Sequence, residues 1–210
     1  MLIIGAKGHA KEILDIIHEQ NSLGELIFFD DVSKDLPPHL FDTFRIIKNE
    51  TEARDYLHQN PFFILGLGDP QKRFKLCSKI EIWGGQVISV IASSSKISKY
   101  DVNLNQGINI MHNVVLSSGV SIGKGSLINA GCLIHHDVSV GEFCEISPGT
   151  ILTGNVKIGN YSRIGSGTVI IPNIKVGNNV TVGAGAVVIN DIKDNEIVVG
   201  VPSKVIGINP

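Results

Sequence analysis

The sequence contains few cysteines, and their positions exclude a common kind of metal site. Three cysteines occur in 210 residues, together with one tryptophan and two methionines. Cys77, Cys132 and Cys144 show none of the paired spacings of zinc or iron–sulfur ligands. We therefore expect no resident metal, and we expect the thiols to be small core residues in a reducing cytosol.

Excess charge and long apolar segments are also missing. The formal net charge is −2 at pH 7 and no basic run occurs, which gives nucleic-acid binding no electrostatic support. No apolar stretch approaches the roughly 20 residues that a membrane-spanning helix needs. The start, Met1–Gly5, lacks the basic segment of a signal peptide. We expect a cytoplasmic protein that neither binds nucleic acid nor inserts into a membrane.

The most prominent pattern is a six-residue repeat between Leu104 and Val188. A series of smaller or β-branched residues precedes each aliphatic position by two residues, and Gly, Asn or Asp follows it by three. Phe143 and Tyr161 are exceptions at the third position. The fifteen aliphatic positions are Leu104, Ile110, Leu116, Ile122, Ile128, Ile134, Val140, Ile146, Leu152, Ile158, Ile164, Ile170, Val176, Val182 and Val188.

This triple pattern predicts the hexapeptide repeat of a parallel β-helix. A short strand directs one aliphatic and one smaller side chain inward, and a residue that tolerates positive φ turns the corner. Three sides close one coil of about 18 residues, and the coils pair at roughly 4.8 Å. No hexad carries an insertion, so about five coils should form a plain prism, with an irregular first coil near Ile97.

The residues before the repeat alternate between strand and helix patterns. Strands are expected at 2–6, 25–30, 62–66 and 86–91, and helices over about 10–21, 51–59 and 70–80, with a polar loop at 32–50. The first helix should end near residues 21–24. This alternation predicts a small Rossmann-like α/β domain over residues 1–92, followed by the β-helix domain over 93–210.

A glycine-bearing turn after the first strand indicates a phosphate site. Gly5 and Gly8 form G-x-x-G rather than the dinucleotide fingerprint, so NAD is not expected. Backbone N–H groups at a helix start favour an anion, and Asp30 and Asp31 end the second strand, where a carboxylate commonly reaches a ribose hydroxyl. The alternatives are an ordinary strand-to-helix turn and a solvated strand end or helix cap.

Together these features resemble the sialic-acid O-acetyltransferase type of hexapeptide-repeat acyltransferase, whose relatives acetylate the amine of nucleotide-linked amino-dideoxy sugars. The resemblance covers nearly the whole chain. It implies a left-handed β-helix, acetyl-CoA as co-substrate, a homotrimer with the cofactor between adjacent prisms, and a role in bacterial surface-glycan synthesis. The residues that carry it are Gly5-Ala6-Lys7-Gly8-His9, Phe29-Asp30-Asp31, Gly68-Asp69, Ile128-Asn129-Ala130-Gly131, His136-Asp137, Ser147-Pro148-Gly149 and Gly200-Val201-Pro202.

The resemblance implies that His136 is the general base, since the free pKa of imidazole, about 6.5, lies near the working pH. His135 is an adjacent competitor. Asp137 matches the residue that orients the imidazole, although it also occupies a corner position and the family more often has Glu. Gly154 lies eighteen residues after His136, and its N–H is expected to polarise the thioester carbonyl; the alternative is one more flexible corner.

The resemblance also implies binding residues outside the base. Asn129 matches a residue that contacts the acceptor amine, unless it is only a turn Asn, and Ala184 falls where the family contacts the cofactor through its backbone. The nucleotide part of the acceptor should lie over Gly8 and His9, near the two aspartates at the end of the second strand.

Other functions remain as alternatives on the same fold. Sialic-acid O-acetylation is the nearest, and a non-catalytic binding or assembly subunit is the second, since it would have no need of His136. A metal hydratase is disfavoured because it requires three converging histidines, whereas His135 and His136 are adjacent on one strand and point apart.

Overall fold

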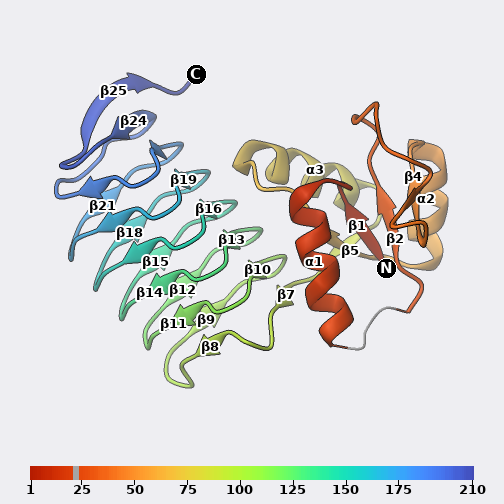
Figure 1. Cartoon of the computed structure of the whole chain (residues 1–210), viewed down its shortest axis with the longest axis horizontal. Coiled ribbons are helices and arrows are strands. Elements are labelled where there is room, and N and C mark those ends of the chain that lie inside the picture. The colour runs from red at the N-terminus through yellow and green to blue at the C-terminus, as the bar shows by residue number, and fades with distance from the viewer. Residues whose placement is uncertain (21–23) are drawn as a thin grey trace.

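The computed structural model describes residues 1–20 and 24–210 (Figure 1). It consists of an N-terminal α/β domain beside a long left-handed parallel β-helix, so the predicted fold is confirmed. The first helix ends at Glu19, and residues 21–23, where its end was expected, lie outside the described part. Within the described residues, no helix is long and apolar enough to cross a membrane.

The N-terminal domain contains one sheet with the strand order β3-β4-β2-β1-β5-β6. All its pairs are parallel except β3 with β4. Its elements are β1 (Leu2–Ile4), α1 (Gly8–Glu19), β2 (Ile27–Phe29), β3 (His39–Leu40), β4 (Phe44–Ile47), α2 (Glu50–Gln59), β5 (Phe62–Leu65), α3 (Pro70–Ile82) and β6 (Gln86–Val87).

The central strands β1, β2 and β5 are apolar throughout because both faces of the sheet are covered there. Side chains alternate between the faces along each strand. Ile3 packs with α1 on one face, whereas Leu2 and Ile4 pack with α2 and α3 on the other. This two-sided burial defines the doubly wound arrangement and leaves the carboxyl ends of β1, β2 and β5 at one edge.

Two expectations about this domain were wrong. Residues 32–50 contain β3 and β4 rather than a polar loop alone, because Ile46 and Ile47 are buried and β4 continues the sheet beside β2. Residues 86–91 form two strands in different sheets rather than one. Here β6 pairs with β5, whereas β7 (Val90–Ile91) pairs with β10 of the prism. The boundary between the folding units, expected at residues 92–93, stays a prediction.

The prism has three sides, which we name face A, face B and face C. Face A is β7-β10-β13-β16-β19-β22-β24-β25, face B is β8-β11-β14-β17-β20-β23, and face C is β9-β12-β15-β18-β21. Consecutive coils pair in parallel, and only the terminal β24–β25 pair is antiparallel. The first coil begins at β7, and β9, which contains Leu104, is its third side.

The strands of the prism alternate among the three faces along the chain. Their bounds are β7 (Val90–Ile91), β8 (Lys96–Ile97), β9 (Asn103–Leu104), β10 (Asn109–Ile110), β11 (Val115–Leu116), β12 (Ser121–Ile122), β13 (Leu127–Ile128), β14 (Leu133–Ile134), β15 (Ser139–Val140), β16 (Glu145–Ile146), β17 (Ile151–Leu152), β18 (Lys157–Ile158), β19 (Arg163–Ile164), β20 (Val169–Ile170), β21 (Lys175–Val176), β22 (Thr181–Val182), β23 (Val187–Val188), β24 (Glu196–Val199) and β25 (Lys204–Ile208).

The interior of the prism is formed by the two series that the repeat predicts. The aliphatic series packs into one column, and the smaller series lies buried beside it. Cys132 and Cys144 belong to the smaller series, and burial raises their thiol pKa values to about 11 and about 12. Ser126 and Ser162 satisfy their hydroxyls by donating to backbone carbonyls of the next coil, so the core contains no unpaired hydroxyl at these positions.

The two aromatic exceptions in the repeat have a structural reason. Phe143 and Tyr161 take up positive φ at their corners, 49° and 59°, as Gly or Asn does elsewhere. Their rings stack on each other, and Phe74 of α3 packs edge-on against both, with centroids 5.3 and 5.4 Å away. They therefore anchor the N-terminal domain on the prism.

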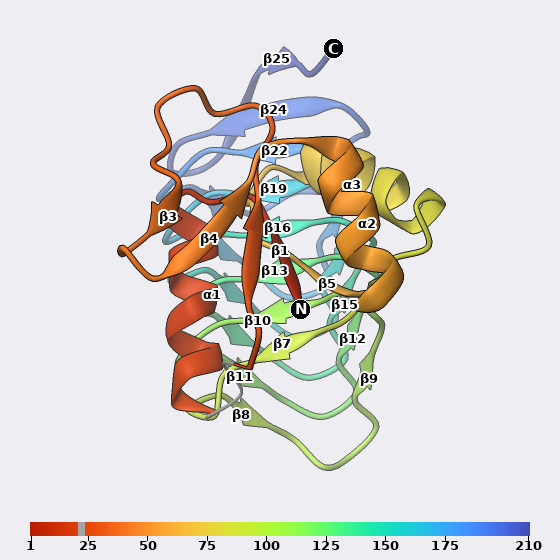
Figure 2. The ribbon, with the colours of Figure 1, turned by 90° about the vertical axis from the view of Figure 1, so that its right-hand side faces the viewer.

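The N-terminal domain covers face A and neither of the other two faces (Figure 2). Its α1 side packs against outward residues of that face, including Leu127 and Met111. Helix α3 lies along the corner between faces C and A, where Lys124 forms an ion pair with Glu81 of the helix at 2.6 Å. The corner between faces B and C is consequently the part of the prism opposite the N-terminal domain.

Candidate functional site

A histidine–aspartate pair stands at the corner between faces B and C. His136 and Asp137 follow β14, and the His136 Nδ1 atom lies 2.8 Å from the Asp137 Oδ2 atom. A carboxylate only accepts, so Nδ1 carries the proton and Nε2 keeps its lone pair. Asp137 also has a φ of 59°. The sequence offered two alternative roles for Asp137, turning the corner and bonding the imidazole. In the structure Asp137 does both.

Gly154 lies against the imidazole, one coil along the same corner. A Cβ atom at this position would lie 2.6 Å from both Nε2 and Cε1 of His136, closer than real side chains approach. Gly154 is buried, and within the described chain its N–H group has no acceptor. Close approach of the histidine ring, rather than a positive φ, therefore requires glycine here.

Asn129 and Ala184 lie on the opposite edge of face B, at its corner with face A. The Asn129 Oδ1 atom accepts from the N–H of Ala130 at 2.8 Å, as in a turn. Ala184 is exposed. In one chain these two residues are thus separated from His136 by the width of face B. All the predicted prism residues border that face, on one edge or the other.

A cavity of about 510 Å³ lies at the carboxyl ends of β1, β2 and β5. The chain passes from one side of β1 to the other here, and ligands of open α/β sheets bind at such a switch point. The cavity includes the predicted Asp30, Asp31 and His9, but not Gly8. Its lining residues are Ile4, Gly5, Ala6, Lys7, His9, Phe29, Asp30, Asp31, Val32, Ser33, Gly66, Leu67, Gly68, Lys72, Lys75 and Leu76.

The start of α1 has open hydrogen-bond donors beside this cavity. Lys7 occupies the N-cap without a side-chain hydrogen bond, and the first turn contains no acidic residue. Nothing lies within 4 Å of the place that a Gly8 side chain would take. The exposed N–H groups of the first turn therefore remain accessible to an anion.

Two lysines of α3 add positive charge that sequence reasoning missed. Lys72 and Lys75 lie one turn apart on α3, are exposed, and line the cavity. A basic i, i+3 pair at the start of a helix after the third parallel strand was visible in the sequence. The sequence did not show that the two lysines point toward the cavity, because that depends on the rotation of the helix about its axis.

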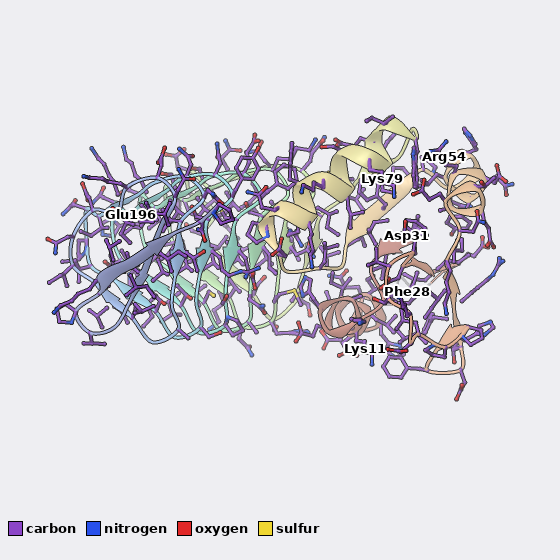
Figure 3. All side chains as sticks on the ribbon, turned by 90° about the horizontal axis from the view of Figure 1, so that it is seen from above. Lys11, Phe28, Asp31, Arg54, Lys79 and Glu196 are labelled. Carbon is purple, nitrogen blue, oxygen red and sulfur yellow. The ribbon has the colours of Figure 1, made fainter. Side chains whose placement is uncertain are left out.

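The two aspartates have different partners. The Asp30 Oδ2 atom accepts from the N–H of Ala6 at 3.1 Å, and its Oδ1 atom accepts from the N–H of Ser33 at 2.9 Å. Asp30 therefore holds two loops of the cavity in place. Asp31 pairs with Lys79 of α3 at 3.2 Å, as their neighbouring positions in Figure 3 show. Asp31 is thus an exposed strand end, as the alternative expected, that also forms an ion pair.

His9 joins the two domains instead of donating to a ligand. Its Nε2 atom lies 3.1 Å from the Asn109 Nδ2 atom of the prism, and its Nδ1 atom lies 3.2 Å from a carboxylate oxygen of Glu12. Asn109 donates, so the proton of His9 resides on Nδ1 and points to Glu12. Burial lowers the pKa of His9, with Glu12 opposing that shift. Neither ring nitrogen is left to donate to a phosphate.

Metal coordination finds no support in the described residues. Among them, no three His, Cys, Asp or Glu side chains converge as metal ligands. His112, the remaining prism histidine, contacts Ser94 at 3.1 Å on another part of the coil.

Comparison with known proteins agrees with this architecture. Residues 1–80 match the family described as PglD N-terminal domain, and residues 119–190 match the bacterial transferase hexapeptide family in three overlapping segments. The acetyltransferase domain of PglB from Neisseria gonorrhoeae, in complex with acetyl coenzyme A, is 30% identical over 98% of both chains, with a TM-score of 0.88.

Two further structures are similar over nearly the whole chain. A mutant of perosamine N-acetyltransferase from Caulobacter crescentus, in complex with CoA and GDP-perosamine, is 27% identical over 98% of this chain and 96% of that one, with a TM-score of 0.88. WeeI from Acinetobacter baumannii shares the fold at 24% identity and a TM-score of 0.87, covering 98% of both chains.

The chain therefore belongs to the hexapeptide-repeat acyltransferases that have a PglD-type N-terminal domain. Within that class it is an acetyltransferase.

Proposed function

We propose that the enzyme transfers the acetyl group of acetyl-CoA to the amine of a nucleotide-linked amino-dideoxy sugar, with His136 as general base. The observation that carries the proposal is the His136–Asp137 pair beside Gly154, at an exposed corner where the imidazole fills no core. The binding of CoA and GDP-perosamine by the Caulobacter relative supports the two substrate classes.

The chemistry follows from the tautomer of His136. The acceptor nitrogen attacks the thioester carbonyl carbon and passes its proton to Nε2, while Asp137 stabilises the imidazolium through Nδ1–H. A tetrahedral intermediate forms, and the N–H of Gly154 is placed to stabilise its oxyanion. The C–S bond then breaks, and the thiolate of CoA takes up the proton from the imidazolium. The base thus returns to its starting state.

The N-terminal cavity is the proposed seat of the nucleotide. The open start of α1 and the ammonium groups of Lys72 and Lys75 suit a diphosphate. Apolar walls formed by Val32, Leu67 and Leu76 suit a base or ribose. We retain Gly8 as a backbone donor. We assign Asp30 and Asp31 to shaping the cavity, since their carboxylates are already bonded within the protein.

Face B supports assembly into a homotrimer. From β11 to β23 its outward positions form an apolar column, with the exposed Lys96 of β8 at one end, whereas the outward positions of face C are polar or basic. An aliphatic column on a surface favours burial against another chain. The column consists of Val115, Leu133, Ile151, Val169 and Val187. The corresponding positions on face C are Asn103, Ser121, Ser139, Lys157 and Lys175.

A trimer would also complete the active site. In one chain the nucleotide cavity lies over face A and His136 lies at the opposite corner, so an acceptor held there does not reach its own base. Packing of the B–C edge of one prism against the A–B edge of the next would bring Asn129 and Ala184 of a neighbour toward His136 and Gly154. Such a heterologous contact closes into a ring of identical sites. Acetyl-CoA would lie in each groove.

The central test replaces His136 by Ala and measures acetyl transfer to a panel of UDP-, GDP-, dTDP- and CMP-linked amino sugars. Loss of a general base typically costs about 10²–10⁴-fold in rate. The melting temperature should stay unchanged, since the side chain is 58% exposed. His135→Ala is the matched control and should retain wild-type turnover. Asp137→Asn preserves a residue suited to positive φ but removes the carboxylate, so a slow Asp137→Asn enzyme separates orientation from the turn.

Other outcomes would point to different functions. Wild-type turnover in His136→Ala would reject the assigned base and favour a non-catalytic role for this corner. Transfer to sialic acid but to no nucleotide sugar, with no nucleotide bound in calorimetry, would favour O-acetylation of a free sugar.

A further inference from the structure

The loop between β5 and α3 forms one wall of the nucleotide cavity and rests on the prism. Gly66, Leu67 and Gly68 line the cavity. Gly68 also lies against face A, where a Cβ atom would be 3.1 Å from a carboxylate oxygen of Glu145. The position of this wall is thus set from the prism side as well as from the N-terminal sheet.

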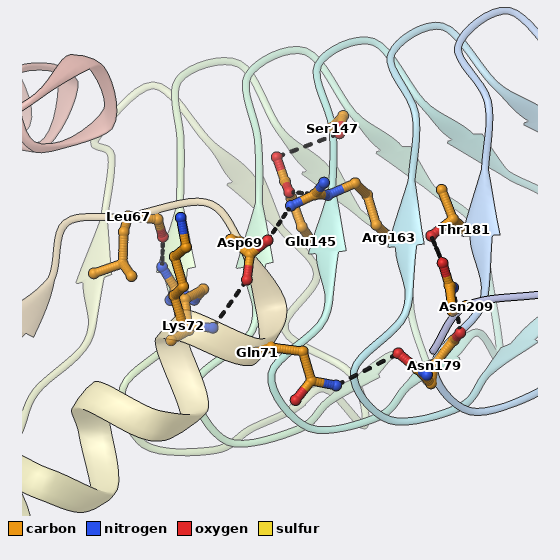
Figure 4. A network of polar contacts seen from close by, with 11 residues as sticks. Leu67, Asp69, Gln71, Lys72, Glu145, Ser147, Arg163, Asn179, Thr181 and Asn209 are labelled. Atoms are coloured by element: carbon orange, nitrogen blue, oxygen red, sulfur yellow. Dashed lines mark hydrogen bonds and ion pairs between the residues drawn. The ribbon is translucent and has the colours of Figure 1, made fainter. Parts of the chain in front are cut away.

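Asp69 connects the loop to face A by two different contacts. Its Oδ1 atom caps α3 by accepting from the N–H of Lys72 at 2.9 Å. Its Oδ2 atom accepts from the Arg163 Nη2 atom at 3.0 Å, and the Arg163 Nε atom donates to Glu145 at 2.8 Å. Figure 4 shows this chain of contacts running from Lys72 to the outward side chains of β16 and β19. The same residue therefore fixes the helix that presents Lys72 and the ion pair with the prism.

A buried arginine holds the other end of the same loop. Arg73 is fully buried and donates to the carbonyls of Leu65 at 3.1 Å and Leu67 at 2.7 Å. Its Nε atom donates to the carbonyl of Gly125 in the prism at 2.7 Å. Burial lowers the pKa of its guanidinium to about 10, so the group stays charged at neutral pH. The loop is therefore held at both ends by residues that form hydrogen bonds with the prism.

We propose that Arg163 and Glu145, which belong to the acetyltransferase prism, are positioning residues for binding of the acceptor nucleotide. They act through Asp69, which fixes the loop at Gly68 and the first turn of α3, and hence the wall and the cation of the cavity. This inference rests on the proposed nucleotide site and adds to it residues that lie outside the cavity lining. Neither Arg163 nor Glu145 lines the cavity.

The ion pair is suited to a test because it should contribute little to the fold. The side chains of Arg163 and Asp69 are 40% and 38% exposed, and pairs so open to solvent add little stability. Asp69→Asn is the most selective change, since Asn caps helices as well as Asp does while removing the charge that Arg163 pairs with. A change in nucleotide binding without a change in melting temperature would thus report on loop position.

The experiment measures GDP, dTDP and UDP binding by calorimetry on full-length protein, followed by steady-state kinetics with the nucleotide sugar that the wild type accepts. Arg163→Ala, Glu145→Gln and Asp69→Asn should each weaken the tightest nucleotide by about three- to tenfold. They should raise KM for the acceptor and leave KM for acetyl-CoA unchanged. Arg163→Lys should recover part of the loss. Lys157→Ala, an exposed cation on face C, is the matched control and should bind as the wild type does.

The outcomes separate this inference from the proposed function. Nucleotide affinity unchanged in all three variants, while the wild type binds, would overturn the positioning role and leave the proposed function intact. A wild type that binds none of the three nucleotides would overturn both. Losses in the Arg163→Ala Asp69→Asn double variant equal to the sum of the single losses would also contradict it, because residues acting through one contact are not additive.

Discussion

At the scale of single residues, Gly154 occupies a position where the histidine ring has taken the space of a side chain. The glycine needs no positive φ, so its function at this corner is to admit the imidazole. A methyl group would therefore disturb the base without straining the coil. In the proposed mechanism, the residue acts through the position of His136 as well as through its own N–H group.

We predict that Gly154→Ala lowers kcat while the melting temperature changes little. The added Cβ would lie 2.6 Å from Nε2 of His136 and must displace the ring. A misplacement of about 1 Å can cost up to about 100-fold in rate. Steady-state kinetics should show the loss, and the same change in a His136→Ala background should cost almost nothing further. An equal loss in both backgrounds would instead place the effect in the cofactor path.

Sequence reasoning predicted which residues meet at the proposed catalytic corner, but it did not predict the hydrogen-bond partners of the residues around the cavity. The repeat predicted that His136, Asp137 and Gly154 share a corner, because a strict period of six fixes which residues do so. Their catalytic roles came from the family resemblance and stay a prediction. His9 and Asp30 were expected to contact the ligand; both line the cavity, and both also form hydrogen bonds within the protein that the sequence did not indicate. Nothing local in the sequence distinguishes a carboxylate that binds backbone N–H groups from one that binds a ribose.

At the scale of elements, the strands within the six-residue repeat could be predicted from the sequence, and several strands outside it could not. The prism strands were placed correctly, since every hexad repeats the same inward pair. By contrast, β4 was missed because four residues in a polar stretch show too little alternation. The short run at 86–91 looked like one strand because its apolar residues serve two adjacent sheets. Pairing over long sequence distances decides such cases.

Helix α1 gives a second prediction, which concerns pH. Burial lowers the pKa of His9 below that of the unfolded chain, so the unfolded state takes up a proton first as the pH falls. The stability that neutral His9 provides is complete above about pH 6.5 and is lost as the pH falls below it. Glu12, Arg73 and Glu145 are the charged groups that act on the ring.

We therefore expect the melting temperature of the wild type to fall on acidification from about pH 7 to about pH 5 more steeply than that of His9→Gln. Glutamine can still accept from Asn109 but does not titrate. His39→Gln, at an exposed position on β3, is the control and should follow the wild type. Parallel curves for wild type and His9→Gln would show that His9 does not titrate on unfolding in this range.

At the scale of the whole molecule, we expect the apolar column of face B to decide the assembly state. Leu133 is 37% exposed in the isolated chain and lies between Val115 and Ile151 in the apolar column. We predict that the wild type sediments as three chains of 22.6 kDa and that Leu133→Glu sediments as one. A buried unpaired carboxylate at such an interface is strongly unfavourable. Ser139→Glu, outward on face C, should stay trimeric.

The same variant tests where the active site lies. Because the acceptor and the base are proposed to come from different chains, monomeric Leu133→Glu should lose acetyl transfer while it still binds nucleotide in calorimetry. A monomeric wild type with full activity would contradict both the trimer and the shared site.

The stacked rings of Phe143 and Tyr161 distinguish one position on a face whose coils are otherwise nearly identical. Successive coils of the prism present nearly the same outline, so a domain sliding along face A would meet almost equivalent seats one coil apart. The two aromatic corners, which belong to two successive coils, interrupt that sameness where Phe74 packs against them. The two rings make one position on face A different from the others. They therefore fix the register of the N-terminal domain, which could otherwise dock one coil higher or lower.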